Sequence, residues 1–164
     1  MEVIRNKLDN QIIVKCPPFN IGVNSERNII NHLEKYFIDK GFKILNSSDK
    51  VLTVSIGNLF TNFITLSMKK LKREISVIIT ENDQIEILSK VDTTGQAIRK
   101  SEMDYFTLEV EDIKSYIQSS KDYDLADKKN KKIKSINLWL LILLIFGIPI
   151  VYLLIYFLYN YLTN

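Results

Sequence analysis

The sequence has few of the residues that build disulfide frameworks and the commonest metal or catalytic sites. Among 164 residues there are 1 cysteine and 1 histidine. A single cysteine excludes a disulfide framework and any zinc or iron–sulfur site made from several cysteines. A single histidine excludes a multi-histidine metal site and disfavours a serine–histidine–aspartate triad. We therefore expect no metal and no other cofactor, and we name no catalytic residue.

Glycine and proline are scarce too. The chain has 5 Gly and 3 Pro, which excludes collagen-like and proline-rich classes. A share of 25% charged residues and a net charge of +3 exclude a chain that is kept disordered by its composition. The length leaves room for one domain of ordinary size.

The most conspicuous feature that is present is an apolar run near the C-terminal end. Residues 138–159 read LWLLILLIFGIPIVYLLIYFLY and contain no charged side chain. A helix of that length spans about 33 Å, against about 30 Å for the hydrocarbon core of a bilayer. A buried core helix would be shorter and would carry a polar stripe, and this chain is too small to surround a helix that is apolar on every side. The run therefore predicts a transmembrane helix, which we place at 136–162.

Individual residues of the run fit a membrane helix. Gly147 and Pro149 are both tolerated in such helices, and Pro149 should bend this one because it removes a backbone donor. Trp139 stands at one end of the run, and Tyr156 and Tyr159 stand at the other. Aromatic rings are enriched at the two membrane interfaces, so we expect these three side chains to lie there.

A cluster of lysines precedes the run and predicts its orientation. Because basic flanks are retained in the cytoplasm, we expect a cytoplasmic N-terminal side and a C-terminus outside. The first ten residues, MEVIRNKLDN, lack the apolar core of a signal peptide. We therefore expect a single-pass, tail-anchored protein of the cell membrane. The lysines are Lys128, Lys129, Lys131, Lys132 and Lys134.

The same five lysines account for the basic character of the chain. The remaining residues carry 17 basic and 19 acidic side chains, a net charge of −2. A basic surface for nucleic acid is therefore not expected on the domain. We interpret the lysines as a topology signal that also contacts the membrane surface, where each is worth about 1 kcal/mol against anionic headgroups.

Residues 1–120 predict one domain of mixed strands and helices. Several short runs alternate apolar and polar residues, which is the two-residue period of a strand. The first of them should stop at Pro17 and Pro18. Short polar connections favour an antiparallel meander. The predicted strands are 10–16, 42–46, 51–56, 63–68, 73–80 and 84–91.

Two amphipathic helices are predicted to cover one face of this sheet. The first spans 25–40, and Gly41 stands where a helix commonly ends. The second begins near Ser101 and Asp104, which resemble a capping box. The predicted fold class is therefore α+β: a two-layer antiparallel sheet of about five to six strands with two helices on one face, plus one C-terminal transmembrane helix.

Residues 121–135 are polar and mostly charged. They predict a basic juxtamembrane linker between the domain and the membrane helix. A flexible stretch of about 15 residues reaches roughly 20 Å, so the domain should stay close to the bilayer surface.

The loop 91–96, VDTTGQ, is the most distinctive candidate for ligand binding. Asp92, Thr93 and Thr94 offer carboxylate and hydroxyl oxygens, and Gly95 offers backbone freedom, so a small ligand or a phosphate could bind there. Turn formation alone explains the same composition. Neither a GxGxxG nor a GxxxxGK[ST] motif is present.

Other polar residues have simpler interpretations. His32 should be a surface histidine, because no orienting partner or nucleophile can be nominated from spacing. Cys16 should be a small core or edge residue. Three acidic side chains of the second helix should form a solvated face: Glu102, Glu109 and Asp112.

Three functional hypotheses remain open. The first is a non-enzymatic protein-interaction or complex-organising module, with the lipid bilayer and an unidentified protein as partners. The alternative is a binding domain for a lipid or other apolar ligand, because the order strand–helix–sheet–helix is loosely similar to helix-grip folds. The third is an enzyme whose site would be the Asp92 loop. The lack of a chemical constellation beside a clear anchor favours the first.

Overall fold

A six-stranded sheet forms the body of the domain. The computed structural model describes residues 1–6, 9–20, 29–65, 67–119, 121 and 124–163. The strands are β1 (Glu2–Asn6), β2 (Gln11–Asn20), β3 (Lys43–Ser47), β4 (Val51–Ile56), β5 (Arg73–Ile79) and β6 (Gln84–Asp92). Their spatial order is β1-β2-β6-β5-β4-β3, and every neighbouring pair is antiparallel. The α+β class and the antiparallel sheet are therefore confirmed.

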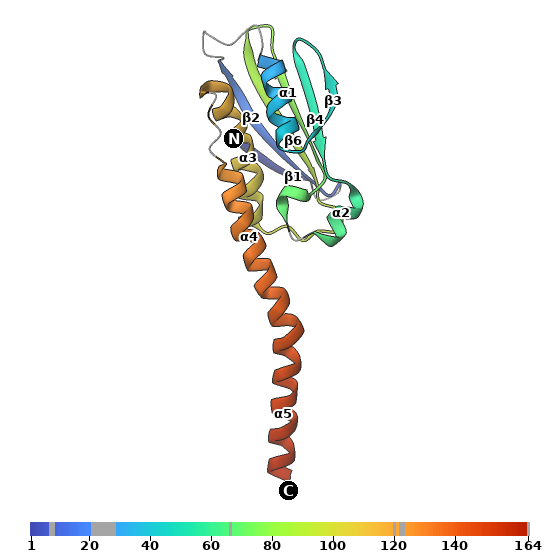
Figure 1. Cartoon of the computed structure of the whole chain (residues 1–164). Coiled ribbons are helices and arrows are strands. Elements are labelled where there is room, and N and C mark those ends of the chain that lie inside the picture. The colour runs from blue at the N-terminus through green and yellow to red at the C-terminus, as the bar shows by residue number, and fades with distance from the viewer. Residues whose placement is uncertain (7–8, 21–28, 66, 120, 122–123, 164) are drawn as a thin grey trace.

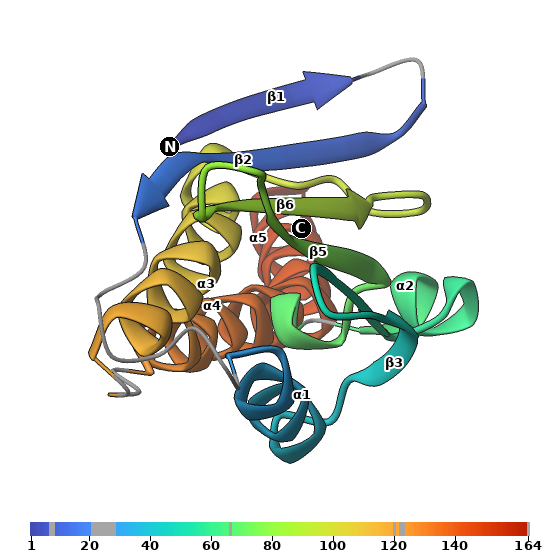
Figure 2. The same cartoon turned by 90° about the horizontal axis from the view of Figure 1, so that it is seen from above.

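Helices and a short 3-10 turn accompany this sheet. They are α1 (Ile29–Asp39), α2 (Leu59–Ile64), the short 3-10 turn η1 (Met68–Lys70), α3 (Lys100–Ser119) and α4 (Leu125–Ile142). Figure 2 shows α1, α3 and α4 on the same side of the sheet. The two predicted helices correspond to α1 and α3, and the structure adds α2 and α4 to them.

The inner face of the sheet and the inner faces of the helices share one core. Apolar side chains of β2, β4, β5 and β6 alternate inward, as strands with one buried face require. The apolar stripes predicted on α1 and α3 are buried in the same core. They consist of Ile29, Ile30, Leu33, Tyr36 and Phe37 of α1, and of Phe106, Val110, Ile113 and Ile117 of α3.

The first predicted helix ends at the expected residue. Gly41 has a φ of +85°, a conformation that glycine adopts without steric cost. Gly41 N–H donates to Ile38 O, and Phe42 N–H donates to Phe37 O, both at 2.9 Å. This pair of bonds closes a helix C-terminus. The predicted start at residue 25 lies outside the described residues.

The predicted end of the first strand is wrong. β2 continues through Pro17 and Pro18 as far as Asn20. The register against β6 shifts between Cys16 and Phe19, so the prolines stand at an irregularity of the ladder. A proline lacks a backbone donor and is tolerated in a strand at such a bulge.

The strand predicted at 63–68 is also wrong, because α2 and η1 occupy this part of the chain. Asn58 starts α2 with a reciprocal pair of bonds. Thr61 N–H donates to Asn58 Oδ1 at 2.8 Å, and Asn58 N–H donates to Thr61 Oγ1 at 2.9 Å. This capping box favours a helix. A short alternation of apolar and polar residues was the weaker signal.

The predicted capping residues of α3 need a similar correction. The helix begins at Lys100, so Ser101 lies inside its first turn. Glu102 reaches back instead, and its Oε2 accepts Arg99 N–H at 2.8 Å. The reach of a glutamate to the N-cap backbone is one half of a capping box.

Most of the predicted linker 121–135 is helical. α4 begins at Leu125, and Ala126, Asn130 and Ile133 are buried. Charged residues obscured the first part of this helix in the sequence, because they occupy most of the exposed positions between Leu125 and Lys134. The domain boundaries at 120 and 135 stay a prediction.

One helix is long and apolar enough to cross a membrane. It covers Leu125–Asn160, and none of its most apolar window is buried. α4 continues through a π-helical turn, Leu143–Gly147, into α5 (Ile148–Thr163) and leaves the domain (Figure 1). A π turn is a common local departure from regular α-helical geometry, and prolines cause others; Pro149 is the second residue after this turn.

Candidate functional site

The loop predicted to bind a ligand lies where β6, α2 and the turn after β1 meet. Asp92 Oδ1 accepts Thr94 N–H at 2.9 Å, and Asp92 Oδ2 lies 3.6 Å from Lys72 Nζ. Thr93 donates its N–H and its hydroxyl to Asn10 O, each at 2.7 Å. These oxygen atoms and donors therefore bind the protein itself.

Two further contacts make this loop a junction of the fold. Gly95 has a φ of +77°, and a Cβ there would come within 2.5 Å of the Phe63 ring. Asn62 is fully buried; it donates to Asp92 O at 2.9 Å and accepts Lys72 N–H at 2.8 Å. These contacts favour the structural interpretation, and ligand binding at the loop stays a prediction.

The Asp92 carboxylate is stabilised in its charged form. Partial burial works to raise the pKa of Asp92, but the hydrogen bonds from Thr94 and the nearby Lys72 ammonium outweigh it and hold that pKa below its usual range. The charge of Asp92 therefore contributes to folding around the junction.

The three acidic side chains expected on a solvated face of α3 are buried instead. Glu102, Glu109 and Asp112 all lie inside the domain, and each binds a different neighbour. The prediction is wrong because α4, which the sequence predicts as part of a linker, covers part of this face. The sequence patterns did not predict that these three carboxylates are buried and bind other parts of the domain.

Glu109 forms a buried ion pair with Arg73 of β5. Arg73 Nε and Nη2 donate to the two Glu109 carboxylate oxygens at 2.8 and 2.6 Å. Tyr105 donates its hydroxyl to the same carboxylate at 3.2 Å. Burial, and then the Glu109 charge, raise the pKa of Tyr105, so its hydroxyl remains a donor. A bidentate, fully hydrogen-bonded pair of this kind fixes α3 in one register against the sheet.

Asp112 caps α4 from a neighbouring helix. Its Oδ1 accepts Leu125 N–H at 3.1 Å, and its Oδ2 accepts Ala126 N–H at 2.9 Å. The first N–H groups of a helix have no partner within the helix, and a carboxylate also interacts favourably with the helix dipole. The start of α4 is therefore fixed to α3.

Further contacts attach the next two turns of α4 to η1. Asn130 Oδ1 accepts the Ser67 hydroxyl at 3.0 Å and Lys69 N–H at 3.3 Å. Asp127 Oδ2 accepts Lys69 Nζ at 2.9 Å. Because Asn130 and Ser67 are both buried, this contact belongs to the interior of the domain.

Glu102 extends the attachment to the start of the apolar run. Its Oε1 accepts Arg99 Nη2 at 2.7 Å and Asn137 Nδ2 at 3.2 Å. Arg99 also donates to Asn137 Oδ1. Asn137 directly precedes the uncharged run 138–159, so polar contacts with the domain continue until the apolar segment begins.

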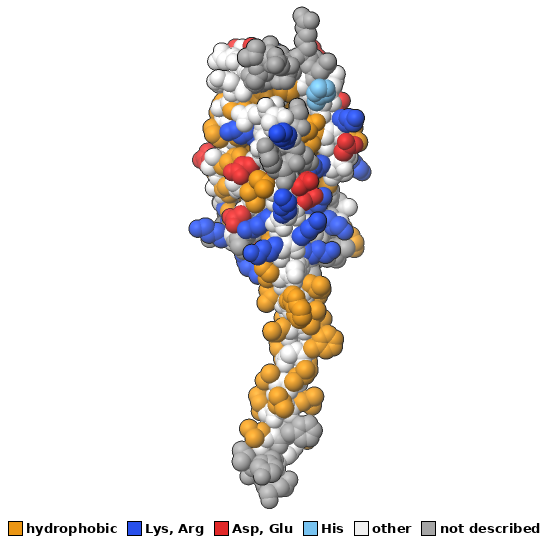
Figure 3. Space-filling model, turned by 60° about the vertical axis from the view of Figure 1, so that its left-hand side comes forward, with side chains coloured by type: hydrophobic (Ala, Val, Ile, Leu, Met, Phe, Trp, Pro, Cys, Tyr) orange, Lys and Arg blue, Asp and Glu red, His pale blue; other side chains and the backbone are white. Residues whose placement is uncertain are grey.

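The lysines predicted to contact a membrane lie on α4. Lys128, Lys131, Lys132 and Lys134 are exposed, whereas Lys129 Nζ pairs with Asp104 at 3.0 Å. Figure 3 shows lysine and arginine side chains gathered where the domain gives way to the apolar helix. Their contact with lipid stays a prediction.

The predicted interface aromatics project from the apolar helix. Trp139, Tyr156 and Tyr159 are all exposed. The spacing from the tryptophan to the two tyrosines corresponds to about 26–30 Å of helix, which matches a hydrocarbon core of about 30 Å.

A surface hollow of about 670 Å³ lies between α1 and the α3–α4 pair, and His32 is one of its lining residues. Two ion pairs cross it. Lys40 Nζ lies 2.6 Å from Asp124, and Lys69 Nζ lies 2.9 Å from Asp127. The first pair joins the end of α1 to the start of α4, and the second joins η1 to α4. Among the described residues, no three or more His, Cys, Asp or Glu side chains are grouped to hold a metal ion.

Among the described residues, buried apolar side chains of the sheet and the helices pack against one another in one core. The cavity beside Arg73 and Glu109 measures about 20 Å³, which is room for a single water molecule. Cys16 is buried on the inner face of β2, and this burial raises the pKa of its thiol. Its interpretation as a small core residue is confirmed.

One pattern in the sequence could have revealed the buried ion pair. Arg73 follows the same alternation as Ile75 and Val77, so it lies on the inner face of β5. A buried arginine requires an acidic partner. On the facing helix, the spacing of seven residues from Glu102 to Glu109 places both acids on one side.

Comparison with known proteins gives no relative for this chain. No family model matches it, and neither a curated protein nor a solved structure matches it.

Breaking the buried ion pair should be far more costly than breaking a surface pair. Glu109→Gln leaves Arg73 without its counter-charge, and we expect a loss of about 3–5 kcal/mol in unfolding free energy, measured by urea denaturation in mild detergent. Lys129→Gln breaks a partly exposed pair and should cost about 0–1 kcal/mol. The double variant Arg73→Met/Glu109→Leu should recover most of the loss. Equal losses for Glu109→Gln and Lys129→Gln would contradict the assignment.

The Asp92 charge should make stability depend on pH in one direction. Because the folded pKa lies below the unfolded one, the stabilisation is complete above about pH 4 and is lost as pH falls through the folded pKa. Asp92→Asn should therefore unfold more readily than the natural chain at pH 7, and the two should converge in acid. Asp49→Asn, at an exposed turn, serves as the control. A pH-independent difference would disprove a role for the charge.

Proposed function

We propose that this chain is a single-pass membrane protein whose α+β domain is held at the cytoplasmic surface, where it serves as a non-enzymatic protein-interaction or complex-organising module. One observation carries the proposal: α4 belongs to the domain core and continues without interruption into the apolar helix.

The attachment of α4 supports a fixed orientation of the domain. A flexible linker would let the domain tumble within its reach. Helix contacts instead extend from the Asp112 cap to Asn137 at the edge of the apolar run. A domain held in this way presents the same surfaces to any neighbour in the plane of the membrane, which suits an organising role better than a tethered catalyst.

The lysines of α4 support the cytoplasmic orientation. Four of the five are exposed and stand directly before the apolar run. Basic flanks are retained on the cytoplasmic side, and they also attract anionic headgroups.

The sheet offers surfaces for a partner. Figure 2 shows α1, α3 and α4 on the inner face of the sheet, and β1 and β3 are its edge strands. Ile4 of β1 and Leu45 of β3 are exposed. Among the described residues, no strand pairs with the outer edge of either. An open edge can accept an added strand from another chain.

The alternative functions have less support. An apolar ligand would need space between the sheet and α3, and that space is filled. An enzyme would use the hollow beside α1 or the Asp92 loop. The lysines and aspartates of the two ion pairs there bind one another, and the loop groups bind the backbone.

Membrane fractionation and cysteine labelling test the anchor and its orientation. The full chain should remain in the alkaline-washed membrane pellet, and a chain of residues 1–137 should be soluble and folded. In a Cys16→Ala background, Thr163→Cys should react with an impermeant maleimide on intact cells, and Asp49→Cys only after permeabilisation. The reverse labelling would overturn the orientation, and a soluble full chain would overturn the anchor.

A truncated chain that is meant to fold must include the part of α4 that packs in the core. A chain of residues 1–120 loses the buried Ala126 and Ile133 and the two backbone N–H groups of α4 that the Asp112 carboxylate binds, so we expect it to be about 3–5 kcal/mol less stable than residues 1–137. Equal stability would contradict the inclusion of α4 in the domain.

Site-specific crosslinking tests the interaction module. A photo-reactive residue at Leu45 or Ile4, on the two edge strands, should give a discrete adduct with one protein in native membranes. The matched control is Ile38, an exposed apolar residue of α1, which should give none. Failure of both edge positions to crosslink would contradict the proposed use of the edges.

A further inference from the structure

α2 exposes a concentrated apolar surface at one end of the domain. Leu59, Phe60 and Phe63 are 46%, 71% and 62% exposed within a single short helix. Single apolar residues on a surface are common, but adjacent large ones mark contact with another apolar phase.

The helix directs one polar side chain, that of Asn62, into the interior of the domain. Asn62, on the opposite side, is fully buried, and both ends of its side-chain amide are hydrogen-bonded to the Lys72 and Asp92 backbone. The capping pair of Asn58 and Thr61 holds the first turn. A helix on a water-facing surface normally has the reverse arrangement. Here the rigid polar anchoring keeps the aromatic rings pointing outward.

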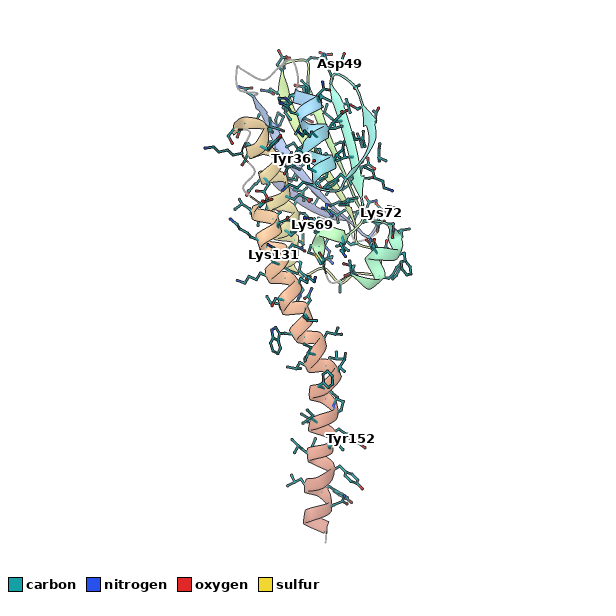
Figure 4. The ribbon with its side chains drawn as sticks, in the orientation of Figure 1. Tyr36, Asp49, Lys69, Lys72, Lys131 and Tyr152 are labelled. Atoms are coloured by element: carbon teal, nitrogen blue, oxygen red, sulfur yellow. The ribbon has the colours of Figure 1, made fainter. Side chains whose placement is uncertain are left out.

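The position of α2 indicates which apolar surroundings the Phe60 and Phe63 rings contact. Figure 1 places α2 at the end of the domain from which the apolar helix emerges. In Figure 4, Lys72 and Lys131 lie towards that end, whereas Asp49 lies at the opposite end. Exposed lysines near an apolar surface complement anionic lipid headgroups.

We propose that the outer face of α2, formed by Leu59, Phe60 and Phe63, inserts into the interface of the bilayer that the C-terminal helix crosses. This inference rests on the proposed membrane anchor and adds a second point of contact. Two contacts, one at α4 and one at α2, fix the tilt of the domain relative to the membrane plane and the side of the domain that faces the membrane. Aromatic side chains are favoured at this depth.

Tryptophan fluorescence in lipid vesicles tests the inference on the full chain. The protein has 1 Trp, at position 139, so the natural chain reports on the anchor. The variant Phe60→Trp/Trp139→Phe reports on α2, and Leu59→Trp/Trp139→Phe is a second reporter. Asp49→Trp/Trp139→Phe is the matched control at the far end. All four are placed in vesicles of phosphatidylcholine and phosphatidylglycerol that contain lipid brominated near the top of its acyl chains.

We expect bromine to quench the two α2 reporters to an extent comparable with Trp139, and to leave the Asp49→Trp reporter unquenched. Quenching of Trp139 without quenching of either α2 reporter would overturn the inference and leave the anchor intact. Emission from the α2 reporters that is blue-shifted but unquenched would also overturn it, because a protein partner or a second copy would then cover α2. Absence of quenching at Trp139 would overturn the anchor itself.

Discussion

The carboxylate of Asp112 joins α3 to α4 and, through α4, joins the domain to the apolar helix. It binds the free N–H groups at the start of α4 and thereby fixes where that helix begins and which way it points. The buried contacts of Asn130 and Ile133 depend on this start. Since α4 continues into the apolar helix, the direction of that helix relative to the sheet depends on a cap that lies inside a folded domain.

The other buried carboxylates of α3 act in the same way on different neighbours. Glu109 holds Arg73 of the sheet, and Glu102 holds Arg99 and Asn137 at the edge of the apolar run. Apolar packing would keep these elements together without selecting a register, whereas hydrogen bonds to a carboxylate require a particular geometry. α3 therefore contacts the sheet on one side and α4, which leads to the apolar helix, on the other.

The exterior of the domain has an unusual feature at the end from which the apolar helix emerges. There, α2 buries Asn62 and exposes Phe60 and Phe63. This inversion and the lysines of α4 occur at the same end of the molecule (Figures 1 and 3). Both make sense if that end meets a bilayer, whose interface favours aromatic rings and whose headgroups favour cations.

The sequence by itself determined the elements whose signal is local. The alternation in β4, β5 and β6, the apolar face of α1 with Gly41 at its end, and the uncharged run after Asn137 are repeats within a few residues, so they could be predicted. The helical nature of α4, the short helix α2 and the inward direction of Glu102, Glu109 and Asp112 were decided by tertiary structure. A charged residue on a helix is expected to face solvent unless the element that covers it is known. The partners of these carboxylates belong to other elements: Arg73 of β5 for Glu109, and the α4 backbone for Asp112.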